Sequence, residues 1–256
     1  MDNRGIILVS SLILALGIFA AGYSFSRAFY LTHVMDRTVT VKGLTERDVK
    51  SDLSIWELDF RDTGNNLVDL NQRIMNYQKI VTDFLKNQGF ATDELELQPV
   101  KVEDRMANVY QSSNDQSTAN QRFIVTGGIN VRSKKVMMVR KASQAASALL
   151  QQGVPLAVDT TSGNPNPSYY FTDLDAIRPS MLADATLSAK KIAKQFAKDT
   201  DTRLAGIQSA NQGVFQIMSR DTSTMSADWN NAQSALSAID KKVRLVTTIQ
   251  YRIVLK

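Results

Sequence analysis

The residue types that most often carry catalysis are scarce in this chain of 256 residues. Cysteine is absent, which excludes a thiol nucleophile and a thiolate metal site. The only histidine is His33, which lies between a long apolar leader and the first predicted strand. A Ser-His-Asp triad within the globular part is therefore excluded, because the triad needs its histidine beside the nucleophile. We interpret His33 as an incidental residue of a stalk, with titration near about pH 6.5 at a lipid surface as the alternative.

Paired carboxylates are the next candidates for chemistry. Asp199 and Asp201 flank Thr200 where a predicted helix ends, and such oxygens bind calcium in some loops. The glycine and the distal glutamate of a calcium loop are missing, so we interpret the pair as a solvated turn. Asp173 and Asp175 are explained by the dipole and the cap at the amino-terminal end of a predicted helix. We predict no catalytic, metal-binding or cofactor-binding residues, and therefore expect that the protein has no cofactor and is not an enzyme. Catalysis by a carboxylate or a lysine is the least favoured alternative.

A run of 22 uncharged and mainly apolar residues, 5–26, separates Arg4 from Arg27. As a helix it would extend about 33 Å, enough to cross a hydrocarbon core of about 30 Å. We therefore predict an uncleaved transmembrane signal anchor with the lipid bilayer as its partner. A cleaved signal peptide that ends at Ala20-Ala21-Gly22 is the alternative. Because long domains translocate largely regardless of charge, we expect the carboxyl-terminal bulk outside the cytoplasmic membrane.

The charge distribution argues against nucleic acid as a partner. The chain has 30 Lys and Arg against 25 Asp and Glu, a net charge of +5, with the basic residues spread along the sequence. Nucleic-acid-binding domains usually show a basic stripe with aromatic residues between. The spread indicates a solvated surface.

The first half of the folded part predicts two strands, a helix and two more strands. Alternating apolar residues indicate strands over 38–43 and 53–60, which we expect to pair as a hairpin. Apolar residues at steps of three and four indicate a helix over 65–87, ended by Gly89. Two further strands follow, over 94–104 and 122–131.

Two features interrupt this pattern. Residues 106–121 are rich in Asn, Ser and Gln and have no apolar period, which predicts an exposed hairpin loop. Gly127-Gly128 lies within a predicted strand, where it indicates a bulge or a close approach of another backbone. Two glycines are too few for a phosphate-binding loop.

The second half repeats the pattern in shorter units. A helix is predicted that begins with Ser133 as its amino cap and ends before Gly153. The next helix has a capping-box pattern in Thr172 and Asp175, with Pro179 in its first turn, and extends to about Asp199. Residues 219–238 have no such pattern and predict a loop. The predicted strands are 154–160, 168–172, 204–209, 214–218 and 242–255.

These elements define an α+β fold, with antiparallel sheets backed by long amphipathic helices in the order ββαββ-αββ-αββ after one amino-terminal transmembrane helix. The folded domain can be undivided or consist of the halves 38–132 and 133–256. The predicted segments are a cytoplasmic tail, an anchor, a stalk and the folded domain: 1–4, 5–26, 27–37 and 38–256.

Several motifs are shared with one known family. The first half contains Thr38-Val39-Thr40-Val41-Lys42-Gly43, Leu85-Lys86-Asn87-Gln88-Gly89-Phe90 and Leu95-Glu96-Leu97-Gln98-Pro99. The second half contains Tyr169-Tyr170-Phe171-Thr172-Asp173-Leu174, Ala183-Asp184-Ala185-Thr186, Leu204-Ala205-Gly206-Ile207 and the strand from Lys242 to Arg252. In these motifs the chain resembles the SIMPL-domain family of bacterial envelope proteins over nearly all of 38–255.

The resemblance implies an exported or membrane-anchored bacterial protein without known catalytic residues. Some members are linked to oxidative or envelope stress, and some assemble into ring-like oligomers. We therefore expect a non-enzymatic protein of the inner membrane whose periplasmic domain forms a homo-oligomer, because long strands such as 242–255 have edges that need cover. The alternative is a periplasmic binding module for a small ligand or a membrane-protein partner, which would use the turn 162–167 or the polar loops.

Overall fold

The computed structural model describes residues 3–33, 37–107, 121–157, 166–221 and 229–255, with side chains described for 12–27 of the first helix and from 233 onward in the last. The chain divides into two compact units whose segments alternate in sequence. Unit 1 comprises 1–46, 178–215 and 245–256, and unit 2 comprises 47–177 and 216–244. Neither unit coincides with the halves considered from the sequence.

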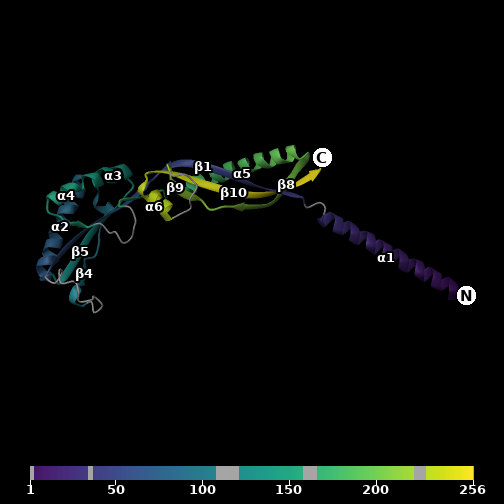
Figure 1. Ribbon diagram of the computed structural model, residues 1–256, viewed down its shortest axis with the longest axis horizontal. Helices are drawn as coiled ribbons and strands as arrows, with labels where there is room; N and C mark the ends of the chain where they lie inside the picture. The colour runs from purple at the N-terminus through teal and green to yellow at the C-terminus, as the bar shows by residue number, and fades with distance from the viewer. Residues whose placement is uncertain (1–2, 34–36, 108–120, 158–165, 222–228, 256) are drawn as a thin grey trace. The chain divides into compact units, whose positions relative to one another are not determined.

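The amino-terminal segment is one continuous helix, α1 (Asn3–His33), of 31 residues (Figure 1). Its described side chains are all exposed, among them Phe19 and Phe25, each 75% accessible. Among the residues whose side chains the structure describes, no helix has an apolar stretch long enough to cross a membrane.

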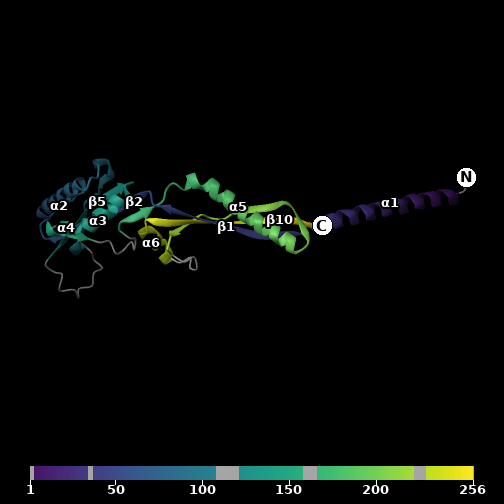
Figure 2. The same ribbon diagram turned by 90° about the horizontal axis from the view of Figure 1, so that it is seen from above.

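Unit 1 contains most of helix α5 (Leu174–Asp199) and a sheet in the order β1-β10-β8. Its strands are β1 (Thr38–Lys50), β10 (Asp240–Leu255) and β8 (Thr202–Gln212), and β8 pairs antiparallel with β10. Helix α5 runs alongside these strands in both ribbon views (Figures 1 and 2). The core between helix and sheet is small and consists mainly of Val41, Ala189, Ala193, Ile249 and Tyr251.

The face of α5 that meets the sheet is made of small residues at steps of four. Ala185, Ala189, Ala193 and Ala197 are all buried. They meet β1 at Gly43, where an added β-carbon would lie 1.9 Å from the Ala185 carbonyl oxygen. The glycine is required there because the helix backbone occupies the space of a side chain.

Unit 2 is built around the pairing of β2 (Leu53–Gly64) with β5 (Phe123–Ser133), which extends without a shift from Ser54–Ser133 to Gly64–Phe123. Gly127 and Gly128 lie within this regular register, so they form no bulge. A β-carbon on Gly127 would lie 2.7 Å from Phe60 Cε2 and 2.9 Å from Ile74 Cγ2, so the atoms nearest to this glycine belong to side chains and not to the approaching backbone that the sequence suggested. The short strands at the sides are β3 (Leu95–Leu97), β4 (Lys101–Asp104), β6 (Leu156–Ala157) and β7 (Ser168–Tyr170).

Three helices pack on the apolar face of this sheet: α2 (Leu67–Asn87), α3 (Val136–Ala145) and α4 (Ser147–Gln151). Asn66 caps α2 by accepting a hydrogen bond from the Val68 amide, and Gly89 follows the helix with φ of +93°, as its position predicts. The core beneath the helices includes Trp56, Phe60, Ile74, Leu85, Ile129 and Leu149.

The remaining elements of unit 2 are short. Strand β9 (Gln216–Ser219) pairs with the first residues of β10, and helix α6 (Trp229–Ser237) packs against β9. The 3-10 helices η1 (Thr92–Glu94) and η2 (Arg105–Ala107) precede β3 and follow β4.

The α+β class with antiparallel sheets and helices is confirmed, but the hairpin prediction is wrong. β1 pairs in one sheet and β2 in the other, so these two strands do not pair with each other. The predicted strand over 94–104 is likewise two short strands, β3 and β4, because Pro99 interrupts the chain between them.

Three predicted helix features also differ. Ser133 is the last residue of β5, and Lys135 precedes α3 as its cap. Pro179 lies beyond the first turn of α5, which begins at Leu174. The predicted loop over 219–238 contains α6, whose alanine and serine content hides its period. The loop over 106–121 lies mostly outside the described residues.

Candidate functional site

The carboxylates considered from the sequence lie at the two ends of α5. Asp199 accepts a hydrogen bond from Gln195 Nε2 at 2.8 Å, and Asp201 has φ of +52° in the turn to β8. Within the described residues, no three or more His, Asp or Glu side chains come together where they could hold a metal ion. The side chain of His33 lies outside the described part of α1.

A different residue, Asp52, binds the amino-terminal end of α5. Its carboxylate accepts hydrogen bonds from the Thr172 amide at 2.8 Å, the Asp173 amide at 3.0 Å and the Thr172 hydroxyl at 3.1 Å. The Asp52 amide donates to the Tyr170 carbonyl at 2.9 Å. The two amides immediately before α5 are thus satisfied by an anion from 120 residues earlier in the chain, which local sequence patterns could not indicate.

Asn166, near the end of the predicted turn 162–167, is hydrogen-bonded to β2. Its side-chain oxygen accepts from the Glu57 amide at 3.0 Å and its amide nitrogen donates to the Glu57 carbonyl at 2.5 Å. Strands β6 and β7 pair with β2 on either side of Glu57. The two hydrogen bonds of the Asn166 side chain therefore take the place of a paired strand residue opposite Glu57. The rest of that turn, 162–165, lies outside the described residues.

Two hollows of unit 2 share Asn166 and Pro167. The larger, of about 420 Å³, has one guanidinium and two carboxylates in its lining, and the smaller, of about 240 Å³, lies over β2 and α3. Burial raises the pKa of Tyr169 in the larger hollow, and nearby Arg140 partly opposes that rise. The larger hollow is lined by Arg140, Asn166, Pro167, Tyr169, Asp221, Ser237, Ala238, Ile239 and Asp240.

Lys241 is a buried cation that was not among the residues predicted to have a functional role. Only 2% of the residue is exposed, and its ammonium donates a hydrogen bond to the Ala235 carbonyl in the last turn of α6. Burial lowers the pKa of Lys241 to about 8. Its burial could have been predicted, because alternate residues of a strand share a face and Lys241 is on the same face as the buried Val243 and Leu245.

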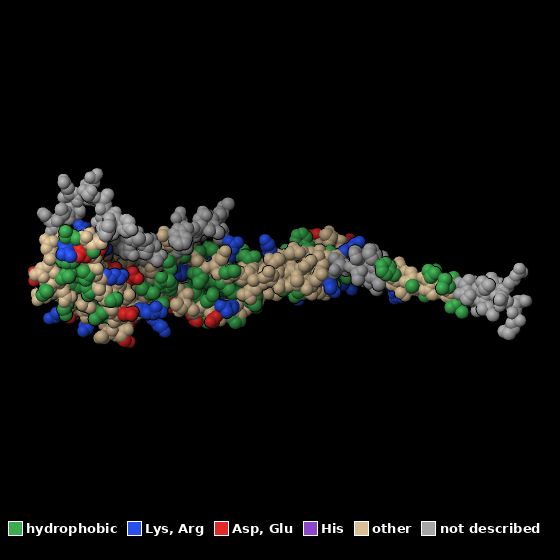
Figure 3. Space-filling view, turned by 90° about the horizontal axis from the view of Figure 1, so that it is seen from below, with side chains coloured by type: hydrophobic (Ala, Val, Ile, Leu, Met, Phe, Trp, Pro, Cys, Tyr) green, Lys and Arg blue, Asp and Glu red, His purple; other side chains and the backbone are tan. Residues whose placement is uncertain are grey.

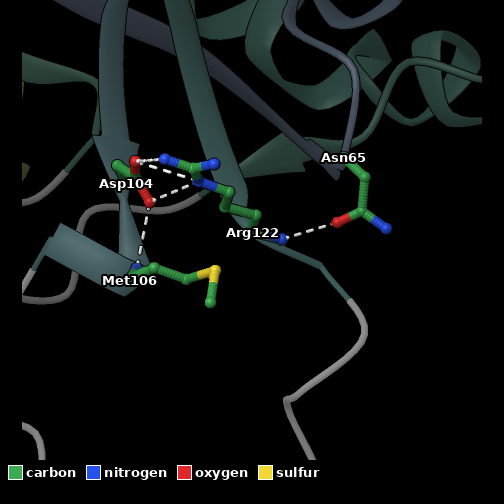
Figure 4. Close-up of polar contacts among 4 residues, drawn as sticks. All are labelled: Asn65, Asp104, Met106 and Arg122. Atoms are coloured by element: carbon green, nitrogen blue, oxygen red, sulfur yellow. Dashed lines mark hydrogen bonds and ion pairs between the residues drawn. The ribbon is translucent and has the colours of Figure 1, made fainter.

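Another ionic contact of unit 2 joins Arg122 to Asp104 (Figure 4). Arg122 Nη2 contacts Asp104 Oδ2 at 2.7 Å, and the Arg122 amide donates to Asn65 Oδ1 at 2.9 Å. The hydrogen bonds from Arg122 to Asp104 lower the pKa of this carboxyl. Asp104 is the last residue of β4 and Arg122 immediately precedes β5, so the ion pair joins adjacent ends of these two paired strands.

The feature of unit 1 with the clearest capacity for binding is its outer strand, β8. Within the described residues β8 pairs only with β10, and all eight residues from Ala205 to Gln212 are exposed. Ile207, near the middle of this stretch, is 56% exposed. An exposed strand edge presents unpaired backbone groups to another chain. The strand predicted to have such an edge, 242–255, is instead the central strand β10.

Comparison with protein families agrees with this fold. The model of the SIMPL family, described as a protein of unknown function (DUF541), matches residues 39–251. The chain therefore belongs to the SIMPL family. A comparison with the curated proteins found no match.

Proposed function

We propose that the protein is a non-enzymatic, membrane-anchored protein of the periplasm that assembles into a ring-like homo-oligomer with a role in envelope or oxidative stress. The observation that carries the proposal is the open edge of β8. Unit 1 has a second outer strand, β1, on the other side of β10. Two different edges on one subunit permit head-to-tail contacts, which generate a ring if the rotation closes.

The leader supports membrane anchoring of this assembly. Residues 5–26 carry no charge, and α1 is helical through all of them. Four residues separate α1 from β1. Each subunit of an oligomer would bring its own anchor, so attachment would gain from multivalency.

The test is the mass of the full chain in detergent, measured for the wild type and for Ile207→Lys. A lysine on a strand edge opposes pairing with a second chain, so we expect an oligomer for the wild type and a smaller species for the variant. Met137→Lys is the matched control, since Met137 is 64% exposed on α3 of unit 2. A monomeric wild type, or an oligomer that Ile207→Lys leaves intact, contradicts assembly through β8.

The second candidate function is a periplasmic binding module, which the larger hollow of unit 2 favours. Arg140 and Tyr169 give it a guanidinium and a hydroxyl that bind the anionic end of a small ligand, and Asp221 and Asp240 give it carboxylates that favour a positive charge elsewhere on that ligand. Melting temperatures measured with a set of small carboxylates and with phosphate test this function. A rise that is lost in Arg140→Gln would support it, and no rise with any of these anions would contradict it.

A further inference from the structure

The net positive charge of the protein resides in unit 1. Its three segments contain 12 Lys and Arg against 6 Asp and Glu, whereas unit 2 contains 18 against 19. On the face shown in Figure 3, basic and acidic side chains are intermixed over unit 2, at the left of the view. The charge that seems evenly spread in the sequence is therefore separated by the fold.

Four of the 12 basic residues of unit 1 lie on the outward face of α5. Lys190, Lys191, Lys194 and Lys198 are all exposed, and their spacing places them on the side away from the buried alanines. Among the described residues none of these four lysines pairs with a carboxylate. Leu187 lies on the same face and is 54% exposed. We call these four lysines the lysine face.

The lysine face lies at the end of unit 1 where β1 begins. Gly43 meets α5 at Ala185 and Ala189, while Val39 and Val41 belong to the cluster that includes Ala193. The start of β1 thus lies beside the carboxyl-terminal half of α5. The Arg37 carbonyl, immediately before β1, accepts a hydrogen bond from the Ile253 amide at 2.9 Å, which fixes the chain's entry into the unit.

Chain length limits how far this end can be from the anchor. From the end of the uncharged run at Ser26, α1 continues for seven residues to His33, or about 10 Å. The link from His33 to Thr38 adds at most about 18 Å. If α1 crosses the bilayer, Thr38 is therefore within about 30 Å of the hydrocarbon, close enough for α5 to reach lipid headgroups.

We infer that the lysine face binds anionic phospholipid headgroups on the surface of the membrane that α1 crosses. The inference rests on the proposed anchoring. Ammonium groups are attracted to anionic lipid, and an exposed leucine among them can enter the boundary between headgroups and acyl chains. A membrane is favoured over an acidic protein because the anchor holds this basic unit at a lipid surface.

The experiment compares the full chain in nanodiscs of phosphatidylcholine with and without phosphatidylglycerol. Each lysine is labelled with a water-soluble amine reagent and quantified by mass spectrometry. We expect the lysine face to react at least about fivefold more slowly in the anionic discs and to recover at high salt, because one basic residue near an anionic surface contributes a factor of this size. Lys79 and Lys86, exposed on α2 of unit 2, should react equally in both discs.

A second measurement reports on the leucine. Because the chain has no cysteine, Leu187→Cys provides a single site for a polarity-sensitive dye. We expect a blue shift in the anionic discs that disappears when the lysine face is changed to glutamine. The matched control changes four exposed lysines of unit 2, Lys79, Lys86, Lys101 and Lys141, to glutamine and should keep the shift.

The outcomes separate this inference from the anchoring it rests on. A chain that enters the discs but shows equal labelling in both lipid mixtures overturns the inference alone. Equal protection of the lysine face in both mixtures shows a protein contact there and also overturns it. A chain that enters neither kind of disc overturns both proposals.

Discussion

Gly43 on β1 and Ala189 on α5 approach so closely that a β-carbon on the glycine would lie 2.9 Å from the alanine β-carbon. This contact allows a helix with a face of small residues to lie directly on the sheet of unit 1. The core there contains few large side chains, so its stability depends on the close approach of backbones more than on buried apolar area.

Replacing this glycine tests the packing of unit 1. Gly43→Ala should lower the free energy of unfolding by about 3 kcal/mol, because the methyl group would meet helix backbone, which cannot move aside. Urea unfolding in detergent measures the loss. Gly206→Ala on β8 is the control, with no atom within 4 Å of the added carbon, and should change stability by less than about 0.5 kcal/mol. Equal effects of the two substitutions would argue against the close contact.

The buried ammonium of Lys241 predicts a rise in stability at alkaline pH. Its folded pKa of about 8 lies below its ordinary value of 10.5, so the unfolded chain binds more protons between these pH values. The free energy of unfolding should therefore increase with pH across this window. Lys241→Met should be more stable than the wild type by about 1–3 kcal/mol at pH 7, since it buries no charge, and this advantage should shrink above pH 8.

The matched substitution Lys79→Met, at an exposed position on α2, should show no such pH-dependent difference. Unfolding curves at several pH values for the three proteins provide the measurement. If the curves of Lys241→Met and the wild type stay parallel from pH 7 to about 10.5, the ammonium is not buried in the folded protein.

Glu94 predicts a loss of stability in acid. Burial alone would raise its pKa, but hydrogen bonds from Ser133 at 2.6 Å, the Ala91 amide at 2.9 Å and Lys135 at 3.0 Å hold the pKa below its ordinary value of 4.5. The stabilisation is present above this pH and is lost as pH falls through the lower folded pKa.

Glu94→Gln should therefore cost about 1–2 kcal/mol at pH 7 and less in acid. Asp93→Asn, at an exposed neighbouring position, is the control and should have little effect. A cost of Glu94→Gln that stays constant down to about pH 3 would show that the carboxylate charge does not contribute.

The hydrogen bonds of Asp52 to the amides before α5 should stabilise the start of this helix. Asp52→Ala removes the acceptor of the Thr172 and Asp173 amides and should lower the free energy of unfolding by about 1–2 kcal/mol. Asp52→Asn keeps one acceptor and should recover part of this loss. Hydrogen exchange at the two amides gives a local measurement, and unchanged exchange in Asp52→Ala would contradict the cap.

Sequence patterns predicted much of this fold where neighbouring residues determine the structure. Helix α2 follows from its apolar period and from Gly89 at its end, whereas its Asn66 cap and the side chains packed against Gly127 were not predicted. The sequence patterns did not predict the structure where it depends on pairing between strands that are far apart in the sequence. Nothing local shows that β1 and β2 enter different sheets or that β10 is central.

The surface features were missed for the same reason. The four lysines of the lysine face look like ordinary solvated charge until the alanine stripe of α5 shows which way they face. The open edge follows from strand order, which the sequence does not contain. The burial of Lys241 could have been predicted, because it lies on the same face of the strand as its buried neighbours.

The mass of the full chain, extracted in mild detergent with α1 retained, tests the central claim most directly. We expect an oligomer of defined size whose subunits begin before residue 5 and therefore keep the uncharged run. Monomers only, or a mature chain that begins near Tyr23, would contradict the proposed membrane-anchored assembly.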